Sequence, residues 1–324
     1  MRTIVIGGGI AGLLVAKKLQ ATLISDTDHF VFLPRLPELL RKQAPTTRIP
    51  ISKCYPNTII ARAKVDLEKG VVYAEDKELV YDQLVIATGA KPNAPVAGVE
   101  KYAHNFYNYR DVQEIKKKVG DKRVVIMGGG PTGVEVAMEL ASSNEVTLLQ
   151  RPDQVLKHFS SHTRSYALRK LKEVGVRVYT SDECTKVTKK YVVSKQAKHP
   201  YDLAIWAGGV QANTPEGLPE GQPVLVDEHL NVVGHNNVWA VGDCARSGSP
   251  LTAQAAQQEA VHVAKNIKRV QQGKSRKTFH FHSKGDFLLL DGVAVMDSRF
   301  TLKGRLTHWI RNKYYDVQIA RYLR

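Results

Sequence analysis

The segment Thr3-Ile-Val-Ile-Gly7-Gly-Gly9-Ile-Ala-Gly12-Leu-Leu-Val-Ala-Lys-Lys-Leu19 decides the fold, because it places a glycine-rich turn between an apolar strand and an amphipathic helix. Each glycine of this Gly-x-Gly-x-x-Gly pattern has a physical role: Gly7 allows the tight turn, Gly9 admits a pyrophosphate, and Gly12 lets the helix pack closely on the strand. The free N–H groups and the positive dipole end of the helix would face the pyrophosphate. The pattern predicts a dinucleotide-binding unit.

The glycine-rich pattern occurs a second time, as Gly128-Gly-Gly130-Pro-Thr132-Gly133-Val-Glu135, again between an apolar strand and a helix. One such pattern is weakly informative, because a plain glycine-rich turn can produce it. Two patterns in matching strand and helix contexts indicate two dinucleotide-binding sites. The sequence therefore predicts an α/β fold with two Rossmann-like dinucleotide-binding domains.

Three further apolar strands end in small or acidic residues, where a ligand can approach the backbone closely. Such endings are expected at the carboxyl edge of a parallel sheet, which is where dinucleotides bind. Each ending taken alone could equally be an ordinary exit from a strand into a loop. The three endings are Thr88-Gly89, Gly208-Gly209 and Gly242-Asp243.

The composition is that of a folded protein with more than one domain. A length of 324 residues exceeds the usual size of a single core, and 43% hydrophobic with 24% charged residues is ordinary for globular proteins. No apolar run approaches the roughly 18 residues that a spanning helix needs, and the chain leads from Met1 directly into a strand without a signal-peptide pattern. We expect a cytoplasmic protein that does not span a membrane.

The three cysteines, Cys54, Cys184 and Cys244, exclude several classes of protein. They form neither a Cys-x-x-Cys pair nor the spacing of zinc ligands, so that neither a disulfide framework nor a metal site is expected. The thiols are expected to be reduced, as in a cytoplasm.

The positive charge is concentrated near the C-terminus. The chain has a net charge of +16, and residues 265–324 contain 14 Lys and Arg but only 4 Asp. This distribution is consistent with an anionic partner such as nucleic acid, acidic lipid or a phosphorylated substrate. A solvated basic surface without a partner is an equally good interpretation.

The order of these motifs resembles the two-dinucleotide-binding-domain flavoproteins, the glutathione-reductase-like superfamily, over nearly the whole chain. Within it the sequence is most similar to type II NADH:quinone oxidoreductases, through the motif of residues 128–135 and Ala253-Gln254-Ala-Ala-Gln-Gln258. The segments implied by the resemblance are 1–105 and 232–275 for a split FAD domain, 106–231 for an inserted NAD(P)H domain, and 276–324 for a C-terminal segment that docks on a membrane or mediates dimerisation.

The resemblance also implies how the first domain would hold FAD. The first glycine loop would bind the pyrophosphate, and Lys64 and Val65 would line the adenine with backbone groups. An acid about 20 residues after the loop normally binds the ribose. Here Ser25 stands in that place, and Asp26 is the candidate substitute. The contacts to the flavin and to its ribityl or phosphate region would come from Thr88, Gly89, Gly242 and Asp243.

A helix is expected to begin at Ala253, because Thr252 is a suitable N-cap. Its N-terminus would face the flavin pyrimidine and stabilise the negative charge that accumulates there on reduction. Gln254 and Gln258 lie four residues apart and therefore share one helix face. The resemblance places both where quinone meets the flavin. The alternative is two glutamines on a solvent-exposed helix surface.

The second glycine loop and the residues around it would bind NAD(P)H. The resemblance implies that Glu135 reaches towards the flavin and the nicotinamide as a proton route, and a surface or capping carboxylate is the alternative. The acid that binds the 2′-hydroxyl of NADH is replaced by the neutral Gln150, and the adjacent Arg151 could pair with a 2′-phosphate. We therefore predict that NADPH is accepted at least as well as by NADH-specific relatives. The cofactor contacts expected here are Gly128, Gly130, Thr132, Gly133, Gln150, Arg151, Gly208 and Gly209.

The C-terminal segment has the pattern of a basic amphipathic helix. Leu302, Leu306, Trp309 and Ile310 fall on one helical face. The resemblance places this region on the membrane, where quinone is dissolved. A helix packed on the FAD domain or on the partner in a homodimer is the alternative. The side chains around the apolar face are Arg305, His308, Arg311 and Lys313.

The leading interpretation is an FAD-dependent NAD(P)H dehydrogenase that passes two electrons to a quinone at the inner face of the cell membrane. Disulfide reductases need a close cysteine pair beside the flavin, and sulfide-oxidising relatives a cysteine in the C-terminal part, which this chain lacks after Cys244. A soluble NAD(P)H oxidase or a reductase of a redox carrier is the first alternative. A redox-sensing flavoprotein that binds nucleic acid ranks lower, because no aromatic-interleaved basic motif is present.

Overall fold

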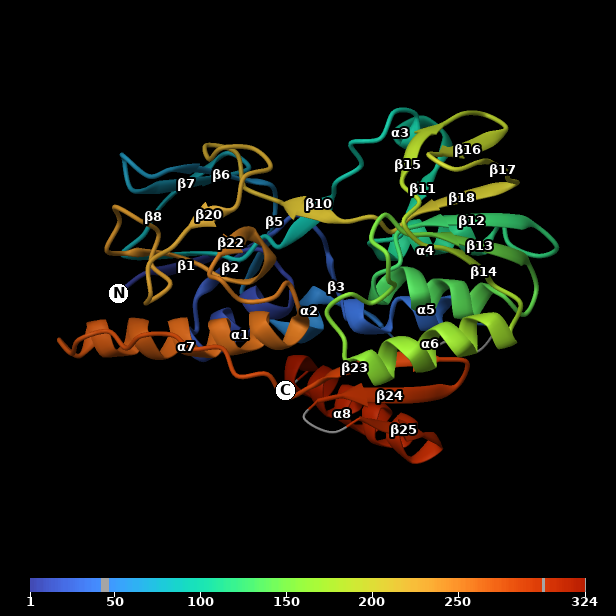
Figure 1. The fold of residues 1–324 in the computed structure, drawn as a ribbon. Coiled ribbons are helices and arrows are strands. Elements are labelled where there is room, and N and C mark those ends of the chain that lie inside the picture. Colours follow the sequence, from blue (N-terminus) through green and yellow to red (C-terminus); the bar gives the residue numbers. More distant parts are fainter. Residues whose placement is uncertain (42–46, 299–300, 324) are drawn as a thin grey trace.

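The computed structural model describes residues 1–41, 47–298 and 301–323. Two parallel five-stranded sheets stand side by side, and an antiparallel C-terminal sheet with a long helix lies below them (Figure 1). The fold is therefore α/β with two Rossmann-like units, as the two glycine-rich patterns predicted. None of the helices in the described parts of the chain combines the length and the apolar character needed to cross a membrane.

The first parallel sheet consists of short strands, the central ones buried on both faces. Its order, β21-β9-β1-β2-β5, places the N-terminal strand in the centre. Apolar residues form continuous runs in the central strands, as expected when other layers cover both faces of a parallel sheet. The strands are β1 (Thr3–Ile6), β2 (Thr22–Ser25), β5 (Thr58–Ile60), β9 (Gln83–Ile86) and β21 (Val238–Ala240).

Alternate residues of this sheet face two different layers. Val5 packs towards α1 (Ile10–Leu19) and α7 (Ala253–Gln271), the helices on one face. Its neighbour Ile4 packs towards an antiparallel meander on the other face. Because side chains alternate along a strand, burial on both faces fixes the register. The meander consists of β6 (Ala63–Asp66), β7 (Val71–Ala74) and β8 (Lys77–Val80).

The chain between β2 and β5 forms a small layer that links the first sheet to the rest of the molecule. Its 3₁₀ turn η2 contacts α4 (Tyr109–Lys116) and α5 (Pro131–Leu140) of the second domain, and its helix α2 contacts the C-terminal helix. The elements of this layer are β3 (His29–Val31), η1 (Leu33–Arg35), η2 (Pro37–Leu40), β4 (Arg48–Pro50) and α2 (Ile51–Cys54).

The second parallel sheet repeats the plan of the first, with the order β11-β18-β12-β13-β14. Ile126 packs towards α5 (Pro131–Leu140), and its neighbour Val125 packs towards a small antiparallel sheet on the opposite face. β11 pairs with β18 of this second sheet, although the sequence placed its residues at the end of the first domain's segment 1–105. The strands are β11 (His104–Asn105), β12 (Arg123–Met127), β13 (Glu145–Leu149), β14 (Arg177–Tyr179) and β18 (Leu203–Trp206).

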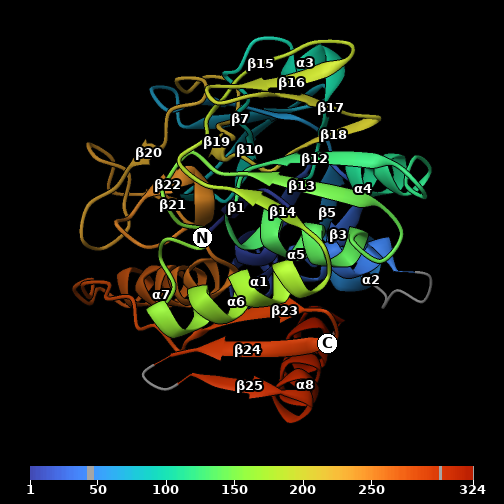
Figure 2. The same ribbon diagram turned by 45° about the vertical axis from the view of Figure 1, so that its right-hand side comes forward.

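An antiparallel ribbon connects the two domains. It is formed by β10 (Ala90–Pro92), which leaves the first domain, and β19 (Val210–Ala212), which returns to it (Figure 2). The other elements around the two sheets are α3 (Val99–Tyr102), α4 (Tyr109–Lys116), α6 (Ser161–Glu173), β15 (Cys184–Val187), β16 (Tyr191–Ser194), β17 (Lys198–Pro200), β20 (Val224–Leu225), η3 (Gly242–Cys244) and β22 (Ala245–Arg246).

The C-terminal residues form a unit that contacts both domains. Asp297 accepts a hydrogen bond from the N–H of Ser160, the N-cap of α6 in the second domain, at 2.8 Å. Tyr322 of α8 (Arg305–Leu323) packs on Phe30 of the first domain, with ring centroids 4.5 Å apart. The unit therefore bridges the two domains from below (Figure 1). Its strands are β23 (Asp286–Leu290), β24 (Val293–Asp297) and β25 (Leu302–Gly304).

The C-terminal helix differs from the predicted amphipathic pattern at two positions. Leu302 lies in β25, before the helix begins. Arg311, expected among the solvent-facing basic residues, is only 1% exposed, because it lies on the face that packs on the first domain. The apolar residues expected on the other face are exposed, with Leu306 at 70% and Trp309 at 58%.

Candidate functional site

The first glycine loop leaves room in front of α1. A Cβ atom on Gly7 would overlap the Ala87 carbonyl, and one on Gly12 would overlap the Gly7 carbonyl, so that neither position tolerates a side chain. A Cβ atom on Gly9, in contrast, would meet no atom within 4 Å. The first internal hydrogen bond of α1 runs from Leu13 N–H to Gly9 C=O, and the preceding N–H groups face this open space. A pyrophosphate fits such a cradle.

The second glycine loop has the same geometry. A Cβ atom on Gly128 would overlap the Ala207 carbonyl, and one on Gly133 would overlap the Gly128 carbonyl. Gly130 again faces open space, in front of the N-terminus of α5. Thr132, in the first turn of α5, is exposed. The two loops are therefore two copies of one anion-binding arrangement.

The interdomain ribbon begins directly after the endings of β9 and β18, which lie at its two opposite ends. Asn213 donates two hydrogen bonds to the first ending: its backbone N–H to Gly89 C=O at 2.9 Å, and its Nδ2 to Thr88 C=O at 3.2 Å. At the second ending, Gly209 C=O accepts from the N–H of Asn93 at 3.1 Å, and a Cβ atom on Gly208 would press on the ring of Trp206. The sequence analysis did not single out Asn213.

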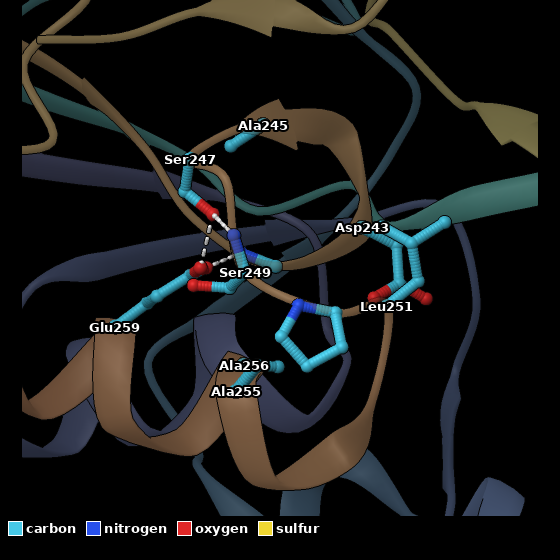
Figure 3. A pocket seen from close by; sticks show the side chains of 10 residues that line it. Asp243, Ala245, Ser247, Ser249, Leu251, Ala255, Ala256 and Glu259 are labelled. Carbon is cyan, nitrogen blue, oxygen red and sulfur yellow. Dashed lines mark hydrogen bonds between the residues drawn. The ribbon is translucent and has the colours of Figure 1, made fainter. Parts of the chain in front are cut away.

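A small pocket lies where β21 ends and α7 begins (Figure 3). Asp243 lines this pocket and makes no hydrogen bond with any described residue. Burial, and then the nearby Glu259, raise the pKa of Asp243 to about 6. Glu259 holds the preceding turn, since it accepts hydrogen bonds from Gly242 N–H at 2.6 Å and from Ser247 Oγ at 2.5 Å. A carboxylate without a partner fits the hydroxyl groups of a flavin dinucleotide, which can donate to it.

The start of α7 is capped as predicted, because the Thr252 hydroxyl accepts a hydrogen bond from the Ala255 N–H at 3.2 Å. Ala253 is the first helical residue. Sequence reasoning did not identify Glu259, a carboxylate on the buried face of this helix. Its signal in the sequence is weak, since a single acid on a buried helix face can also be an ordinary ion-pair partner.

Gln254 and Gln258 share one face of α7, and both hold the backbone of the linker, residues 272–285, between α7 and β23. Gln254 Nε2 donates to Gly285 C=O at 3.1 Å, and its Oε1 accepts from Lys284 N–H at 2.7 Å. Gln258 forms a pair of hydrogen bonds with the backbone of His282, at 2.9 and 3.1 Å. Both side chains are therefore engaged with this linker, and their contact with a quinone stays a prediction.

Glu135 is buried and points towards the C-terminal sheet. Its Oε1 accepts a hydrogen bond from Leu289 N–H in β23 at 2.8 Å. Burial raises the pKa of Glu135 to about 7, and the positive charge of Arg311 acts in the opposite direction. A carboxyl group with a pKa near neutrality can take up or release a proton at physiological pH. The alternative of a surface carboxylate is excluded, and the role in a proton route stays a prediction.

Arg311 belongs to a buried ionic cluster that the sequence analysis missed. Its Nη1 lies 2.8 Å from Glu38 Oε1, and its guanidinium lies over the ring of Tyr315, 4.4 Å from the centroid. Next to this pair, Arg35 Nη2 lies 2.9 Å from Asp316 Oδ1. The cluster thus joins the η1–η2 layer to α8. The positive charge of its Arg311 also acts to lower the pKa of Glu135 in the second domain.

Replacing Glu135 with glutamine is expected to stabilise the protein increasingly as the pH rises from 4.5 to 8. In the folded state the pKa is raised from 4.5 to about 7, so that the protonated form is favoured. The stability that this preference provides is fully present below pH 4.5 and is lost as the pH rises through about 7. The wild type therefore loses about 3 kcal/mol of stability over this pH range. The variant does not lose it, because glutamine does not ionise.

Urea denaturation of wild type and Glu135→Gln at pH 5 and pH 8 measures this effect. Glutamine at the exposed Glu114, where the Lys117 partner lowers the pKa, serves as the control. A difference between Glu135→Gln and wild type that is the same at both pH values would contradict the expectation.

Gln150 and Arg151 lie directly after β13, where the sequence placed them, but only the Gln150 side chain is bound to the protein backbone. Gln150 Oε1 accepts a hydrogen bond from Gly129 N–H at 2.8 Å, and its Nε2 donates to Gln154 C=O at 3.1 Å, so that this amide supports the second glycine loop. The Arg151 side chain is 76% exposed, and its Nη1 lies 3.8 Å from Glu183 Oε1. A neutral amide and a cation therefore stand where an NADH-specific site has its acid.

The remaining residues expected at the adenosine half of FAD lie at the edge of the first domain. Ser25 is buried below the glycine loop, and its Oγ donates to a backbone carbonyl at 2.8 Å. Asp26 is exposed and makes no hydrogen bond or ion pair with the described residues. Val65 N–H donates to Glu216 C=O at 2.7 Å, and Lys64 pairs with the carboxylate of Glu216 at 2.9 Å. The adenine contacts of Lys64 and Val65 stay a prediction.

The three cysteines are free and buried. Burial raises the pKa of the Cys244 thiol, which donates to Ile86 C=O at 3.6 Å and so helps to hold η3 against β9. Across residues 1–41, 47–298 and 301–323, no group of three or more His, Cys, Asp or Glu side chains could hold a metal ion.

A match to a known family covers both glycine loops. Residues 1–260 match the pyridine nucleotide-disulphide oxidoreductase family. The chain belongs to this family. As a pyridine nucleotide-disulphide oxidoreductase it is 27% identical over 323 residues to the mitochondrial external alternative NAD(P)H-ubiquinone oxidoreductase B2 of Arabidopsis thaliana. That alignment covers 75% of this chain but only 54% of the relative, so the chain spans about half the length of that protein.

Other similarities of this oxidoreductase extend along nearly the whole chain. It is 28% identical to the demethylphylloquinone reductase NdbB of Synechocystis, over 94% of this chain and 88% of the relative. The structure of NDH2 from Plasmodium falciparum with NADH matches with a TM-score of 0.87 and 21% identity, covering 99% of this chain and 96% of that one. The sulfide:quinone oxidoreductase of Aquifex aeolicus matches with the same TM-score, 20% identity, and coverage of 99% and 91%. The two structural matches establish a shared fold.

Proposed function

We propose that this oxidoreductase is an FAD-dependent NAD(P)H dehydrogenase that passes two electrons to a quinone. The observation that carries the proposal is the duplicated glycine loop, in two domains that the β10–β19 ribbon joins directly after the strand endings Thr88-Gly89 and Gly208-Gly209. Two dinucleotides bound at these loops would meet where the domains join. The names of the relatives, which include an NAD(P)H-ubiquinone oxidoreductase and a demethylphylloquinone reductase, support a quinone as the acceptor.

In this proposal the protein binds and orients the two dinucleotides. The N–H groups at the start of α1 hold the FAD pyrophosphate, and those at the start of α5 hold that of NAD(P)H. Asp26 accepts from the FAD ribose, and Asp243 accepts from the ribityl hydroxyls. Bound FAD supplies a ring that takes a hydride from the nicotinamide and passes electrons on. The N-terminus of α7, which lines the pocket with Asp243, would favour negative charge on a ring bound there.

Residues 1–105 and 232–275 are proposed as the FAD domain, 106–231 as the NAD(P)H domain, and 276–324 as the C-terminal unit. The two boundaries of the inserted domain move to the ribbon, because β11 pairs in the second sheet and β19 returns to the first domain. Gln254 and Gln258 are proposed to border the quinone, with Glu135 exchanging a proton near the same place. Because no acid ends β13, NADPH is expected to be accepted at least as well as by NADH-specific relatives.

We further propose that the C-terminal unit docks this protein on an anionic membrane surface at the inner face of the cell membrane. The apolar stripe of α8 and β25 is exposed, and two cations of α8, Arg305 and Lys313, are exposed as well. Apolar side chains flanked by cations favour a membrane interface that carries negative charge. The members of the stripe are Leu302, Leu306, Trp309, Ile310 and Val317.

The test is an anaerobic titration of the purified protein with NADH and with NADPH, followed by addition of a short-chain quinone. We expect the flavin absorption band to bleach and then to recover on adding quinone. Bleaching without recovery would contradict the quinone as acceptor and favour an oxidase or a carrier reductase, which oxygen or a carrier protein would reveal. A protein that binds no flavin would contradict the whole proposal.

The same preparation tests the docking surface. Sedimentation with vesicles of neutral or anionic phospholipid should show binding to the anionic ones that weakens with added salt. No binding to either vesicle, together with a concentration-dependent dimer in sedimentation velocity, would assign the stripe to a second copy of the chain instead.

A further inference from the structure

A glutamate that the proposed cofactor site does not use lies beside Arg151. Glu183 Oε1 is 3.8 Å from Arg151 Nη1, and Glu183 Oε2 is 2.8 Å from Lys195 Nζ. Both cations are largely exposed, whereas the Glu183 side chain is 35% exposed. The carboxylate is thus shared between two cations at the rim of the second dinucleotide site.

The backbone holds this group of charges against the end of β13. The N–H of Gln150 donates to Tyr179 C=O at 2.9 Å, and Gln150 C=O accepts from the N–H of Asp182 at 3.0 Å. Two residues further, Ser181 N–H donates to Pro152 C=O at 2.9 Å. The segment that carries Glu183 therefore runs directly beside the residues that face the adenosine ribose in a Rossmann domain.

A buried cluster fixes the position of Glu183 and Lys195. The fully buried Asp182 accepts hydrogen bonds from Ser194 Oγ at 2.8 Å and from Gln196 N–H at 3.2 Å. The backbone N–H of Lys195 donates to Glu183 C=O at 3.0 Å. The backbones of the two residues are therefore paired side by side at the open end of the β15–β16 hairpin, which places Glu183 next to Arg151.

We propose that Glu183 determines the preference between NADPH and NADH by competing with the 2′-phosphate for Arg151 and Lys195. The proposal rests on the proposed binding of NAD(P)H at the second glycine loop. A 2′-phosphate would have to replace the carboxylate at Arg151 and would meet its negative charge at close range. NADH carries a hydroxyl group in that place and leaves the three side chains paired.

The charge state of Glu183 agrees with this role. The Lys195 ammonium group, as hydrogen-bond partner and as a charge, holds the pKa of Glu183 below its ordinary value. The carboxylate is therefore ionised at neutral pH, where the competition with a phosphate takes place.

The test measures the binding of 2′,5′-ADP and 5′-ADP by calorimetry, which does not depend on turnover. For Glu183→Gln we expect 2′,5′-ADP to bind about three- to tenfold more tightly, with 5′-ADP changed less than about twofold. For Arg151→Gln we expect 2′,5′-ADP to bind about tenfold more weakly. In the double variant part of the gain from Glu183→Gln should disappear, because one of the two freed cations is missing.

Glu173→Gln is the matched control. Glu173 also pairs with one lysine and one arginine, Lys170 at 2.6 Å and Arg169 at 3.7 Å, but on α6. We expect this control to bind both nucleotides as the wild type does. The ratio of kcat/KM for NADPH and NADH should follow the binding ratio in all variants.

Equal affinities of Glu183→Gln and wild type for 2′,5′-ADP would overturn the inference, and so would an equal gain for 5′-ADP. Failure of the proposed function looks different: neither nucleotide binds to any variant, and neither NADH nor NADPH bleaches the flavin of the wild type. Unchanged thermal unfolding of Glu183→Gln would show that its effects arise at the site.

Discussion

Replacing Arg311 with alanine is expected to lower the free energy of unfolding by about 3–5 kcal/mol, because it removes the close partner of the buried Glu38 and leaves only Arg35, at 4.0 Å. The two groups are 2.8 Å apart, and both are almost completely buried. A buried carboxylate that loses its cation keeps the cost of desolvation without the attraction that offset it. The stacking of the guanidinium on Tyr315 is lost as well.

Urea denaturation followed by tryptophan fluorescence measures the effect. Lys313→Ala, an exposed change on the same helix, should cost less than about 0.5 kcal/mol and is the control. The double variant Glu38→Gln/Arg311→Met should recover most of the loss, since it removes both charges together and fills a similar volume. Full stability of Arg311→Ala would show that the cluster does not hold α8 in place.

Alanine at Gly12 and at Gly9 should separate folding from cofactor binding. At Gly12 the new Cβ atom would overlap the Gly7 carbonyl, so that α1 cannot keep its distance from β1, and we expect the first domain to lose its stable fold. Gly9 has φ −84°, which alanine adopts without strain, and its Cβ atom would meet nothing within 4 Å. Gly9→Ala should therefore fold normally. It should bind FAD at least tenfold more weakly, because the new methyl group would take up space that the pyrophosphate needs in front of α1.

Thermal unfolding and the flavin retained after gel filtration are the two measurements. Gly130→Ala, the same change in the second loop, provides the control, since it should retain FAD and weaken NAD(P)H instead. If Gly9→Ala kept its full affinity for FAD, the space in front of α1 would not be the cofactor site.

The parts of the structure that the sequence predicted are local in the chain. The three glycines of each loop lie within one turn and one helix start, so that their spacing alone specifies how a strand and a helix approach each other. The N-cap at Thr252 and the shared face of Gln254 and Gln258 follow from helical periodicity in the same way. These features need no knowledge of distant residues.

The parts that the sequence did not predict depend on contacts between distant segments. Arg311 was assigned to the solvent-facing side because of its charge, although Arg311, Tyr315 and Tyr322 share the spacing of one helix face. Only the fold shows that Glu38 stands opposite this face. The partner of Gln254 and Gln258 was missed because the linker 272–285 has no periodicity that reveals its path.

The C-terminal unit, together with the interdomain ribbon, attaches the two dinucleotide-binding domains at two separate places. The ribbon of β10 and β19 joins them at one side, while Asp297 binds the start of α6 and Tyr322 packs on Phe30 at the other (Figure 1). Two bodies joined by a single hinge can swing about it, but a second brace removes that freedom. Under the proposed function, both attachments together would set the distance between the two dinucleotides, so that a change in the C-terminal unit could alter electron transfer without touching either glycine loop.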